Sequence, residues 1–270
     1  MKKILLHGAA YLLALFVLAP FLWVLLTSFQ DVENLMVVPV RISLFDMNFY
    51  YYERLFADEQ FIFSLKNSLI VVSVSTFFSM AICSLGGYAI GALRVRRKDF
   101  ILFLLLGTSL APPLVFLIPL FMVLRFFQLI DTYMGLVFMF LTFQVPIGIW
   151  ILRGFFHSIP RDIFDAATVD GCSRLDTFLT IGLPLARPGI IAVGLFSFLQ
   201  SWNNLLVPLV VTIHRRTTLT VYASNFGWIR QMNYGSATAV AVLSSIPTIL
   251  LAVVFRKQLI EGLMSGATKG

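Results

Sequence analysis

Residues 157–189 read HSIPRDIFDAATVDGCSRLDTFLTIGLPLARPG, an amphipathic stretch between two long apolar runs. Pro160 suits the opening turn of a helix, and Asp162 complements the positive end of the helix dipole. Gly171 can adopt the left-handed conformation that ends a helix. These residues predict one short helix that ends at Gly171.

A second short helix is expected directly after Gly171. Ser173 and Asp176 have the spacing of a capping box, and Pro184 is predicted to stop this helix. The apolar residues of the two helices recur at helical spacing: Ile163, Phe164, Ala167, Leu175, Phe178 and Leu179. An amphipathic hairpin this apolar, when it faces water, is expected to have a partner.

The composition around this hairpin is that of a membrane protein. Of 270 residues 59% are hydrophobic and 12% charged, and the mean hydropathy of +0.91 is too high for a soluble globular domain. A bilayer needs about 20 apolar residues for each helix that spans it. The sequence predicts an all-α protein, one transmembrane domain over 1–270, with six spans: 5–29, 67–93, 100–124, 135–152, 188–213 and 236–255.

Basic residues predict the orientation. Loops on the cytoplasmic side are enriched in Lys and Arg, and 13 of the 20 basic residues fall inside if the N-terminus is cytoplasmic. The cluster from Arg94 to Lys98 is the clearest signal. We therefore expect N-in and C-in topology, with an external segment 30–66, a cytoplasmic loop 153–187 and a cytoplasmic tail 256–270. Since the basic residues are scattered between apolar runs, we read them as topology signals and expect no nucleic-acid binding.

Ionisable residues are missing from the predicted spans. Proton relays and many ion-coupling sites place such residues at membrane depth. The absence favours an uncharged substrate path and an energy source outside the spans. It weakens the interpretation as a secondary transporter without excluding it, because sodium coupling through backbone carbonyls needs no ionisable side chain.

Uncharged polar residues do occur in the spans. They could line a hydrated path or form hydrogen bonds between helices. The candidates for path lining are Gln144, Gln200, Asn203, Asn204 and Ser244. Two further features concern helix geometry: Pro112, Pro113 and Pro119 are expected to interrupt the third span, and Gly86, Gly87 and Gly91 to allow close helix packing.

Neither the cysteines nor the histidines assemble a site. Cys83 lies in an apolar run and Cys172 in a polar loop about ninety positions later, so a disulfide between them is not expected. His7, His157 and His214 fall in separate segments. We expect no metal site and no catalytic residue.

The hairpin resembles a known family. Asp165, Ala166 and Ala167, three residues, Gly171, nine residues, Ile181, one residue, and then Leu183 and Pro184 reproduce the spacing of the EAA signature. That signature is found in permeases of binding-protein-dependent ABC importers. Aspartate stands at Asp165 where the pattern usually has glutamate, and Cys172 where alanine is common.

The resemblance extends over nearly the whole chain. The carbohydrate-uptake branch, and in particular its maltose-type second permease subunit, is similar in Asn48-Phe49-Tyr50 and Leu55-Phe56, Asn67-Ser68-Leu69, Trp202-Asn203-Asn204, and the tail from Gly262 to Gly270. The substrate class implied is a sugar or a sugar derivative. The branch also includes transporters of glycerol phosphodiesters, which stay open as an alternative.

The family's properties are then expectations for this chain. The resemblance implies a type I ABC importer permease in the cell membrane and assigns Asp165, Ala166, Ala167, Asp170, Gly171, Ile181, Leu183 and Pro184 to a coupling helix that docks on an ATPase. The implied partners are a second permease subunit, a dimer of ATPase subunits and an extracytoplasmic solute-binding protein, besides the lipid bilayer. The chain has no GxxxxGK[ST] phosphate loop, so ATP and magnesium are expected in the ATPase subunits and no cofactor in this chain.

An external segment is a candidate contact for the solute-binding protein. The stretch 214–235 holds residue types common at protein interfaces, and Asn225, Trp228 and Tyr234 are the residues expected to make that contact. Trp228 and Tyr234 could instead anchor the chain at the membrane interface. The Gly262 to Gly270 tail either reaches the ATPase or is a flexible terminus.

Two other classes of function compete with an importer subunit. A secondary transporter or facilitator would work alone, and uptake by the purified chain in liposomes would identify it. An enzyme embedded in the membrane would need clustered His, Asp or Cys near one membrane face, a cluster that the sequence does not show.

Overall fold

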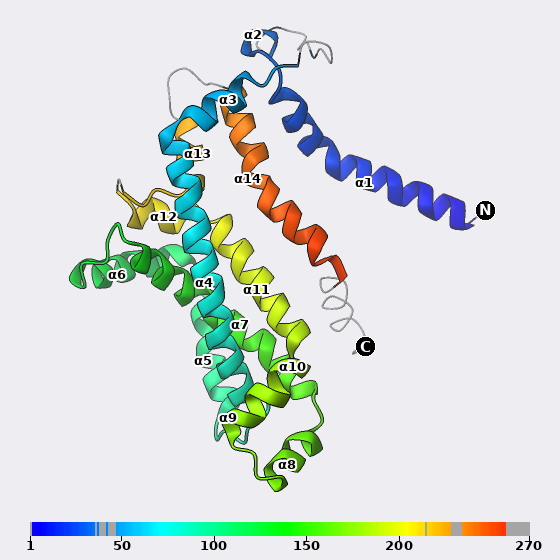
Figure 1. Ribbon diagram of the computed structural model, residues 1–270, viewed down its shortest axis with the longest axis vertical. Helices are drawn as coiled ribbons and strands as arrows, with labels where there is room; N and C mark the ends of the chain where they lie inside the picture. Colours follow the sequence, from blue (N-terminus) through cyan, green and yellow to red (C-terminus); the bar gives the residue numbers. More distant parts are fainter. Residues whose placement is uncertain are drawn as a thin grey trace. The chain divides into compact units, whose positions relative to one another are not determined.

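The computed structural model describes residues 2–35, 37, 42, 47–213, 215–227 and 234–257, and throughout these ranges the regular structure is helical (Figure 1). Contacts divide the chain into two compact units. The first unit comprises Met1–Leu65 and Val221–Ile249, and the second comprises Lys66–Thr220 and Leu250–Gly270. Helices α4 (Glu59–Gly91) and α14 (Tyr234–Val254) run through both units.

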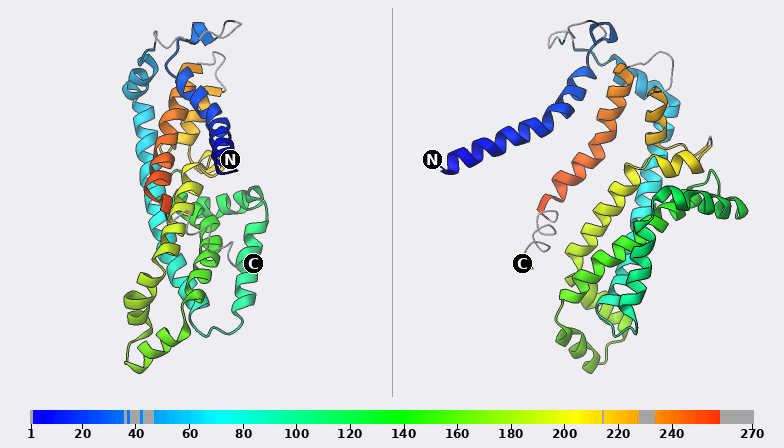
Figure 2. Two further views of the ribbon diagram at one scale, coloured as in Figure 1. Left: turned by 90° about the vertical axis from the view of Figure 1, so that its right-hand side faces the viewer. Right: turned by 180° about the vertical axis from the view of Figure 1, so that it is seen from behind.

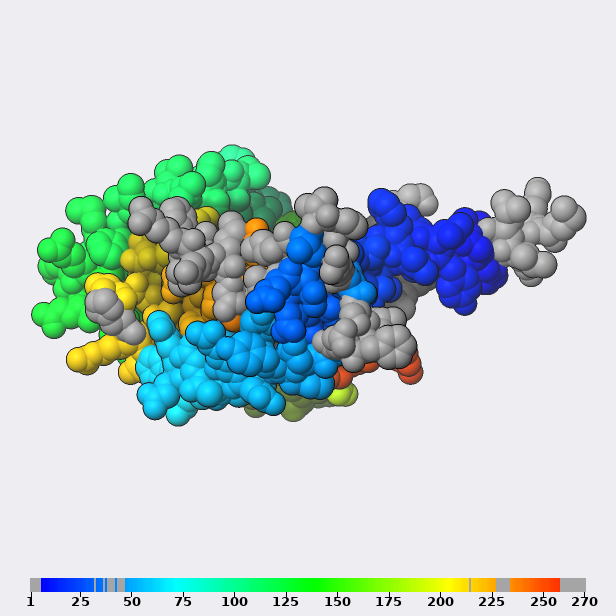
Figure 3. All heavy atoms as spheres, turned by 90° about the horizontal axis from the view of Figure 1, so that it is seen from above, coloured from blue at the N-terminus to red at the C-terminus, as the bar shows by residue number. Residues whose placement is uncertain are grey.

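The first unit holds α1 (Lys2–Thr27), α2 (Val32–Leu35), α3 (Tyr50–Ala57) and most of α14, with α13 (Leu219–Ser224) and the 3-10 turn η2 (Asn225–Gly227) at its border. Tyr51 is buried in this unit, and a Cβ added to Gly235 would lie 2.2 Å from its ring. Helix α1 is different: large apolar side chains such as Leu12 and Phe16 are about three-quarters exposed, and Figure 3 shows its atoms projecting from those of α3. Such a surface is stable only against lipid or another apolar chain.

The second unit contains the elements that form the candidate sites. After α4 it continues with α5 (Lys98–Leu110), α6 (Pro113–Phe126), α7 (Tyr133–Ser158) and α8 (Arg161–Val169). There follow α9 (Arg174–Thr177), the π-helical turn η1 (Phe178–Gly182), α10 (Leu183–Leu185), α11 (Arg187–Trp202) and α12 (Leu206–Val211). Helix α7 is central, because α5 and α11 both pack against it (Figure 2).

Four single helices are long and apolar enough to span a membrane. They are Leu6–Thr27, Glu59–Gly91, Tyr133–Ser158 and Tyr234–Val254, and two bent pairs bring the number to six if each pair is one span. The pairs are Lys98–Leu110 with Pro113–Phe126, bent by 97°, and Arg174–Leu185 with Arg187–Trp202, bent by 78°. The described part of the chain is thus a multi-pass membrane protein, as the hydropathy predicted.

The break in the third span lies where the prolines predicted it. Helix α5 ends at Leu110, and α6 starts at Pro113, which needs no hydrogen bond from its nitrogen in a first turn. Pro119, however, lies inside α6 and does not interrupt it. The 97° bend therefore comes from the adjacent pair Pro112 and Pro113.

The stretch 188–213, predicted as the fifth span, contains a break after Trp202. Helix α11 ends at Trp202, and a separate six-residue helix, α12, follows it. Asn203 donates its amide to the carbonyl of Leu199 at 3.1 Å, and Asn204 accepts from the backbone nitrogen of Val207 at 2.9 Å. Asparagine side chains that bond to nearby backbone in this way compete with a continuous helix.

The glycine cluster of α4 packs against α7, as expected. A Cβ on Gly87 would lie 2.6 Å from the Cβ of Leu152, and one on Gly91 would lie 2.8 Å from the carbonyl oxygen of Arg153. Both distances are far below van der Waals contact. The two helices can approach this closely only because these positions lack side chains.

Candidate functional site

The first helix of the 157–189 hairpin is α8, and it ends as predicted at Gly171. This glycine has a φ of +81°. The nitrogen of Cys172 donates to the carbonyl of Ala167 at 3.0 Å, and that of Gly171 to the carbonyl of Thr168 at 3.2 Å. These two bonds form a Schellman motif, which satisfies the last carbonyls of α8 and reverses the chain.

The second helix starts with the predicted capping box. The nitrogen of Asp176 donates to Ser173 Oγ at 3.2 Å, and the Asp176 carboxylate accepts from the nitrogen of Ser173 at 3.3 Å. The prediction that Pro184 stops the helix was wrong, because the helical path passes through Pro184 and reaches Leu185. The π-helical turn before it shifts the hydrogen-bond register, so the missing donor of Pro184 is tolerated and the 78° bend falls after Leu185.

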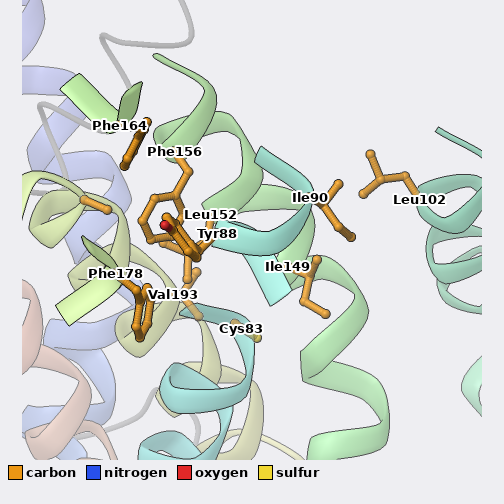
Figure 4. Close-up of a cluster of buried hydrophobic side chains, with 11 residues drawn as sticks. Cys83, Tyr88, Ile90, Leu102, Ile149, Leu152, Phe156, Phe164, Phe178 and Val193 are labelled. Carbon is orange, nitrogen blue, oxygen red and sulfur yellow. The ribbon is translucent and has the colours of Figure 1, made fainter. Parts of the chain in front are cut away.

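An aromatic cluster fixes the hairpin to the spans (Figure 4). Tyr88 near the end of α4 lies among three phenylalanine rings, with centroid distances of 5.9 Å to Phe164, 5.5 Å to Phe156 and 5.1 Å to Phe178. Phe164 and Phe178 belong to the hairpin, whereas Phe156 belongs to α7. Because all four rings are buried, a displacement of the hairpin also requires α4 and α7 to repack.

The predicted coupling residues divide between this core and the outer surface. Ile181 and Leu183 are half-buried. Ala167 is only 3% exposed, because it packs within the chain's own hairpin. Of the two alanines expected to allow close docking, only Ala166 is therefore accessible to a partner. The exposed members of the predicted set are Asp165, Ala166, Asp170, Gly171 and Pro184.

The outward face of the hairpin is also apolar. Val169 is 88% exposed, and Leu175 and Leu179 are each more than half exposed. The predicted apolar face is thus split between two directions. Phe164 and Phe178 point to the core, while these residues and the exposed coupling residues offer a docking surface.

A cavity of about 420 Å³ lies in the second unit, next to the bend between α5 and α6. None of the described residues that line it carries a charged side chain. The lining combines polar side chains with two phenylalanine rings, those of Phe116 and Phe143. The polar residues of the lining are Thr108, Ser109, Thr142, Gln200 and Asn204.

Two of the five predicted path residues, Gln200 and Asn204, line this cavity, and the other three do not. Gln144 is buried between α7 and α11, where its amide donates to the carbonyl of Ser197 at 3.1 Å and to Ser201 Oγ. Gln144 therefore forms hydrogen bonds between helices, which was the alternative to lining a hydrated path. Asn203 caps the end of its own helix, and Ser244 is half-buried in α14.

Between α6 and α7, Asp131 binds the segment that follows α12. Its carboxylate accepts from the backbone nitrogens of Arg215 and Arg216, each at 3.0 Å, and from that of Ile213 at 3.4 Å. The guanidinium of Arg216 lies 4.0 Å from the ring centre of Tyr133. Arg216 is therefore engaged within the chain.

The candidate contacts for the solute-binding protein are described only in part. Asn225 is exposed in η2, and Tyr234 is 42% exposed at the start of α14. Close by in the first unit, Tyr222 donates its hydroxyl to the carboxylate of Asp58 at 2.6 Å. Trp228 and the tail from Gly262 to Gly270 lie outside the described residues.

Sequence reasoning missed three groups of residues. Thr108, Ser109 and Thr142 line the cavity, but an isolated hydroxyl in an apolar run carries no signal for the direction it faces. Tyr88 was part of a span with no visible partner. Asp131 could have been noticed, because it precedes Thr132, whose side chain caps α7 by accepting from Gly135 at 3.0 Å.

Comparison with known proteins gives a consistent result. The family model described as binding-protein-dependent transport system inner membrane component matches residues 83–263. The trehalose/maltose transport system permease protein MalG of Thermococcus litoralis is 32% identical over 100% of this chain and 98% of its own length. The sulfoquinovosyl glycerol transport system permease protein SmoH of Agrobacterium fabrum is 29% identical over 97% and 92%.

Two solved structures share the fold. A chain of a bacterial ABC transporter involved in the import of the acidic polysaccharide alginate aligns with a TM-score of 0.80 at 22% identity, covering 95% of each chain. A second alginate transporter structure, in complex with an alginate pentasaccharide-bound periplasmic protein, aligns with a TM-score of 0.69 at 16% identity, over 94% of this chain and 93% of that one. The fold is that of a type I ABC importer permease. The chain therefore belongs to the family of binding-protein-dependent transport system inner membrane components.

Proposed function

We propose that this chain is the membrane-spanning permease subunit of an ABC importer that takes up a sugar or sugar derivative delivered by an extracytoplasmic solute-binding protein. The observation that carries this proposal is the full-length match to a trehalose/maltose permease. Relatives named for sulfoquinovosyl glycerol and for diacetylchitobiose match over more than nine-tenths of the chain. The common chemistry of these named substrates is a glycosidic, polyhydroxylated molecule.

The cavity beside the α5–α6 bend supports a sugar as the substrate. Hydroxyl and amide side chains can donate to and accept from sugar hydroxyls, and aromatic rings can pack on the apolar faces of a sugar. The size of about 420 Å³ lies within the usual range of small-molecule sites. We assign Gln200, Asn204, Thr108, Ser109 and Thr142 to the translocation path.

The same lining weighs against the alternative substrate. A glycerol phosphodiester carries a negative charge, which in a low-dielectric site needs a cation or several aimed donors. Among the described residues, no Lys or Arg side chain lines the cavity. The neutral lining therefore supports a sugar importer over a phosphodiester importer.

Energy is proposed to enter through the hairpin. The exposed residues Asp165, Ala166, Asp170 and Gly171 would contact an ATPase subunit, while Ala167, Ile181 and Leu183 hold the hairpin to the spans. ATP and magnesium would bind the ATPase dimer, so this chain is a transport subunit and not itself an enzyme. The second permease subunit would complete a permease pair with this chain. Coupling of ATP binding to transport requires that the ATPase dock differently on two states of this pair.

The remaining assignments concern placement. We propose that the chain lies in the cell membrane with both termini in the cytoplasm, which puts the hairpin on the ATPase side. Asn225, Trp228 and Tyr234 would then contact the solute-binding protein on the opposite side. In the chain these residues follow the segment whose backbone nitrogens Asp131 binds, those of Ile213, Arg215 and Arg216.

Reconstitution tests the proposed function directly. The chain, its second permease and the ATPase subunits would be placed in proteoliposomes with purified solute-binding protein and a panel of radiolabelled sugars. We expect uptake that requires both ATP and the binding protein. Uptake by the chain alone would instead identify a secondary transporter, and uptake of a phosphodiester but of no sugar would identify the other branch.

The coupling assignment is tested at Gly171. A side chain here meets no atom within 4 Å, so Gly171→Ala acts through the left-handed backbone alone, which costs an L-residue about 1–2 kcal/mol. Gly171→Asn is the matched control, because asparagine tolerates this conformation. We expect substrate-stimulated ATPase activity to fall about fivefold or more in the alanine variant and to be largely retained in the asparagine variant. Equal activity in both would show that this turn does not carry coupling.

A further inference from the structure

A second cavity, of about 400 Å³, lies on the inner side of the hairpin. Its walls come from the end of α4, from the turn that follows it, and from α8 and α9. Unlike the cavity beside the α5–α6 bend, it is lined by charged side chains. The lining residues with polar or charged groups are Tyr88, Arg94, Arg161, Asp165, Thr168, Cys172, Arg174 and Thr177.

Three arginines from three different segments meet at this cavity. Arg94 belongs to the turn after α4, Arg161 begins α8, and Arg174 begins α9. Asp165 is the one carboxylate in the lining, which leaves two positive charges in excess. Within the described residues, no carboxylate oxygen lies within 4.0 Å of these guanidinium groups. The ion pair that the described residues do contain joins Arg153 to Asp99, outside the lining of this cavity.

The cavity lies next to the end of one candidate membrane span and close in sequence to the start of the next, where lipid headgroups are expected. Arg94 follows the last residue of the α4 span by three positions, and α5 begins at Lys98, so the turn joins two membrane segments at one surface. The pair of Arg153 and Asp99, which joins α7 to α5 at 3.5 Å, indicates the same surface. Tyr88, Leu93 and Phe164 provide an apolar wall next to the charges.

We propose that this cavity binds the phosphate of an anionic phospholipid headgroup, held by Arg94, Arg161 and Arg174. Guanidinium groups match phosphate oxygens geometrically and remain charged at every physiological pH. Basic pockets on the cytoplasmic side of membrane helices are suited to such headgroups. A lipid bound here joins the α4–α5 turn to both helices of the hairpin, and so restrains the element that the proposed function assigns to coupling, although its binding does not depend on that assignment.

An acidic segment of a partner protein is the competing ligand. The observations favour lipid because Tyr88 belongs to the end of the Glu59–Gly91 span, and Ala92 and Leu93, which also form part of the wall, follow that span directly. A water-soluble partner reaches the exposed apolar residues Val169 and Leu175 more directly. Free inorganic phosphate shares the chemistry of the headgroup and is distinguished by experiment.

The chain provides its own reporter for this site. Cys172 lines the cavity and is exposed, whereas Cys83 is buried, and the sequence has no other cysteine. The full-length chain, with any subunits that copurify, would be placed in nanodiscs of phosphatidylcholine alone or with phosphatidylglycerol. We expect alkylation of Cys172 by an uncharged maleimide to slow about fivefold or more when phosphatidylglycerol is present, because a bound headgroup would cover the thiol.

Substitution of the arginines gives the decisive comparison. Arg94→Gln, Arg161→Gln and Arg174→Gln should each abolish most of the slowing, and each should reduce phosphatidylglycerol retained through a detergent wash about fivefold. Arg96→Gln is the matched control, because Arg96 is exposed in the same turn but does not line the cavity. Equal lipid retention in all four variants would overturn the proposal.

Two further arms identify the source of the ligand. Slowing of Cys172 alkylation by inorganic phosphate in phosphatidylcholine nanodiscs, with no effect of phosphatidylglycerol, would replace the lipid with a free anion. Loss of copurifying ATPase subunits in the three cavity variants, with lipid retention unchanged, would show that the arginines bind protein. If the cavity variants and Arg96→Gln all unfold at a lower temperature, the substitutions have damaged the fold. Lipid retention measured on the folded fraction then still decides whether the three arginines bind lipid.

Discussion

Asp131 shows how a single carboxylate can shape a loop. It has a φ of 56°, an unusual conformation for a residue with a side chain, and its own nitrogen donates to the carbonyl of Val211 at 3.0 Å. Its two oxygens accept three backbone hydrogen bonds from 213–216. Charge-assisted bonds of this kind are about twice as strong as neutral ones.

Replacement of this carboxylate should therefore loosen the loop. In Asp131→Asn one oxygen becomes an amide donor that faces backbone N–H groups, so we expect a loss of about 1–3 kcal/mol in unfolding free energy and faster proteolysis after Arg215 or Arg216. Limited trypsin digestion of the purified complex measures this. Asp31→Asn is the control, because the exposed Asp31 carboxylate accepts its described hydrogen bond from the side chain of Asn48 and not from backbone. Equal digestion of both variants would show that the Asp131 carboxylate does not restrain the loop.

Tyr222 gives a pH dependence whose sign follows from its surroundings. Burial, the hydrogen bond to Asp58 and the negative charge of Asp58 raise the pKa of Tyr222 above its ordinary value of 10.0. The unfolded chain then loses this proton near pH 10, before the folded chain does. Stability from this group is fully present below about pH 10 and falls as the pH rises further.

Thermal unfolding between about pH 8 and 11 tests this expectation. The melting temperature should fall above about pH 10 in the natural protein, and the fall should be shallower in Tyr222→Phe. Tyr234→Phe serves as the control because Tyr234 is 42% exposed. If the two phenylalanine variants follow the same curve, the contact between Tyr222 and Asp58 has no such role.

At the scale of elements, the approach of α4 to α7 determines how the second unit packs. Residues Gly87 and Gly91 let the backbones come close, and the aromatic rings of Tyr88 and Phe156 fill the space at the end of the same interface. Since the hairpin rings pack on those two, the interface also determines where the hairpin lies. A change in the helix approach would therefore be felt at the hairpin.

A methyl group at Gly87 tests that interface. The new Cβ would lie 2.6 Å from Leu152 Cβ, so Gly87→Ala should destabilise the protein by about 1–3 kcal/mol through overpacking. Gly154→Ala on α7 is the matched control, because a Cβ there meets no atom within 4 Å. With Cys172 replaced by serine, the reaction of a thiol dye with buried Cys83 on heating reports unfolding, and equal curves for the two variants would contradict the close packing.

The whole molecule is expected to present its two ends to different compartments. From the positive-inside pattern and the proposed docking of the hairpin on an ATPase, we expect Cys172 to lie in the cytoplasm. An impermeant thiol reagent should therefore label the natural protein in inverted membrane vesicles and not in intact spheroplasts. Labelling in spheroplasts would reverse the orientation, and Cys172→Ser controls for reaction at Cys83.

The sequence alone determined the class of the protein and the local geometry of the hairpin. Apolar composition needs no tertiary information, because burial in a bilayer depends on the length of each apolar run. The end of α8 at Gly171 and the capping box at Ser173 are equally local, since each depends on hydrogen bonds within a few residues. The EAA spacing identified the family for the same reason, as a linear pattern.

Only the tertiary structure decided which side chains share a site. Ala167 and Ala166 are neighbours in sequence, yet one is buried and the other exposed, because the hairpin packs on Tyr88 more than seventy residues away. Gln144 bonds across two helices while Gln200 lines a cavity, a difference set by helix rotation that composition does not encode. The three arginines at the second cavity likewise come from separate segments, and they meet because the chain reverses at Gly171 and packs against α4.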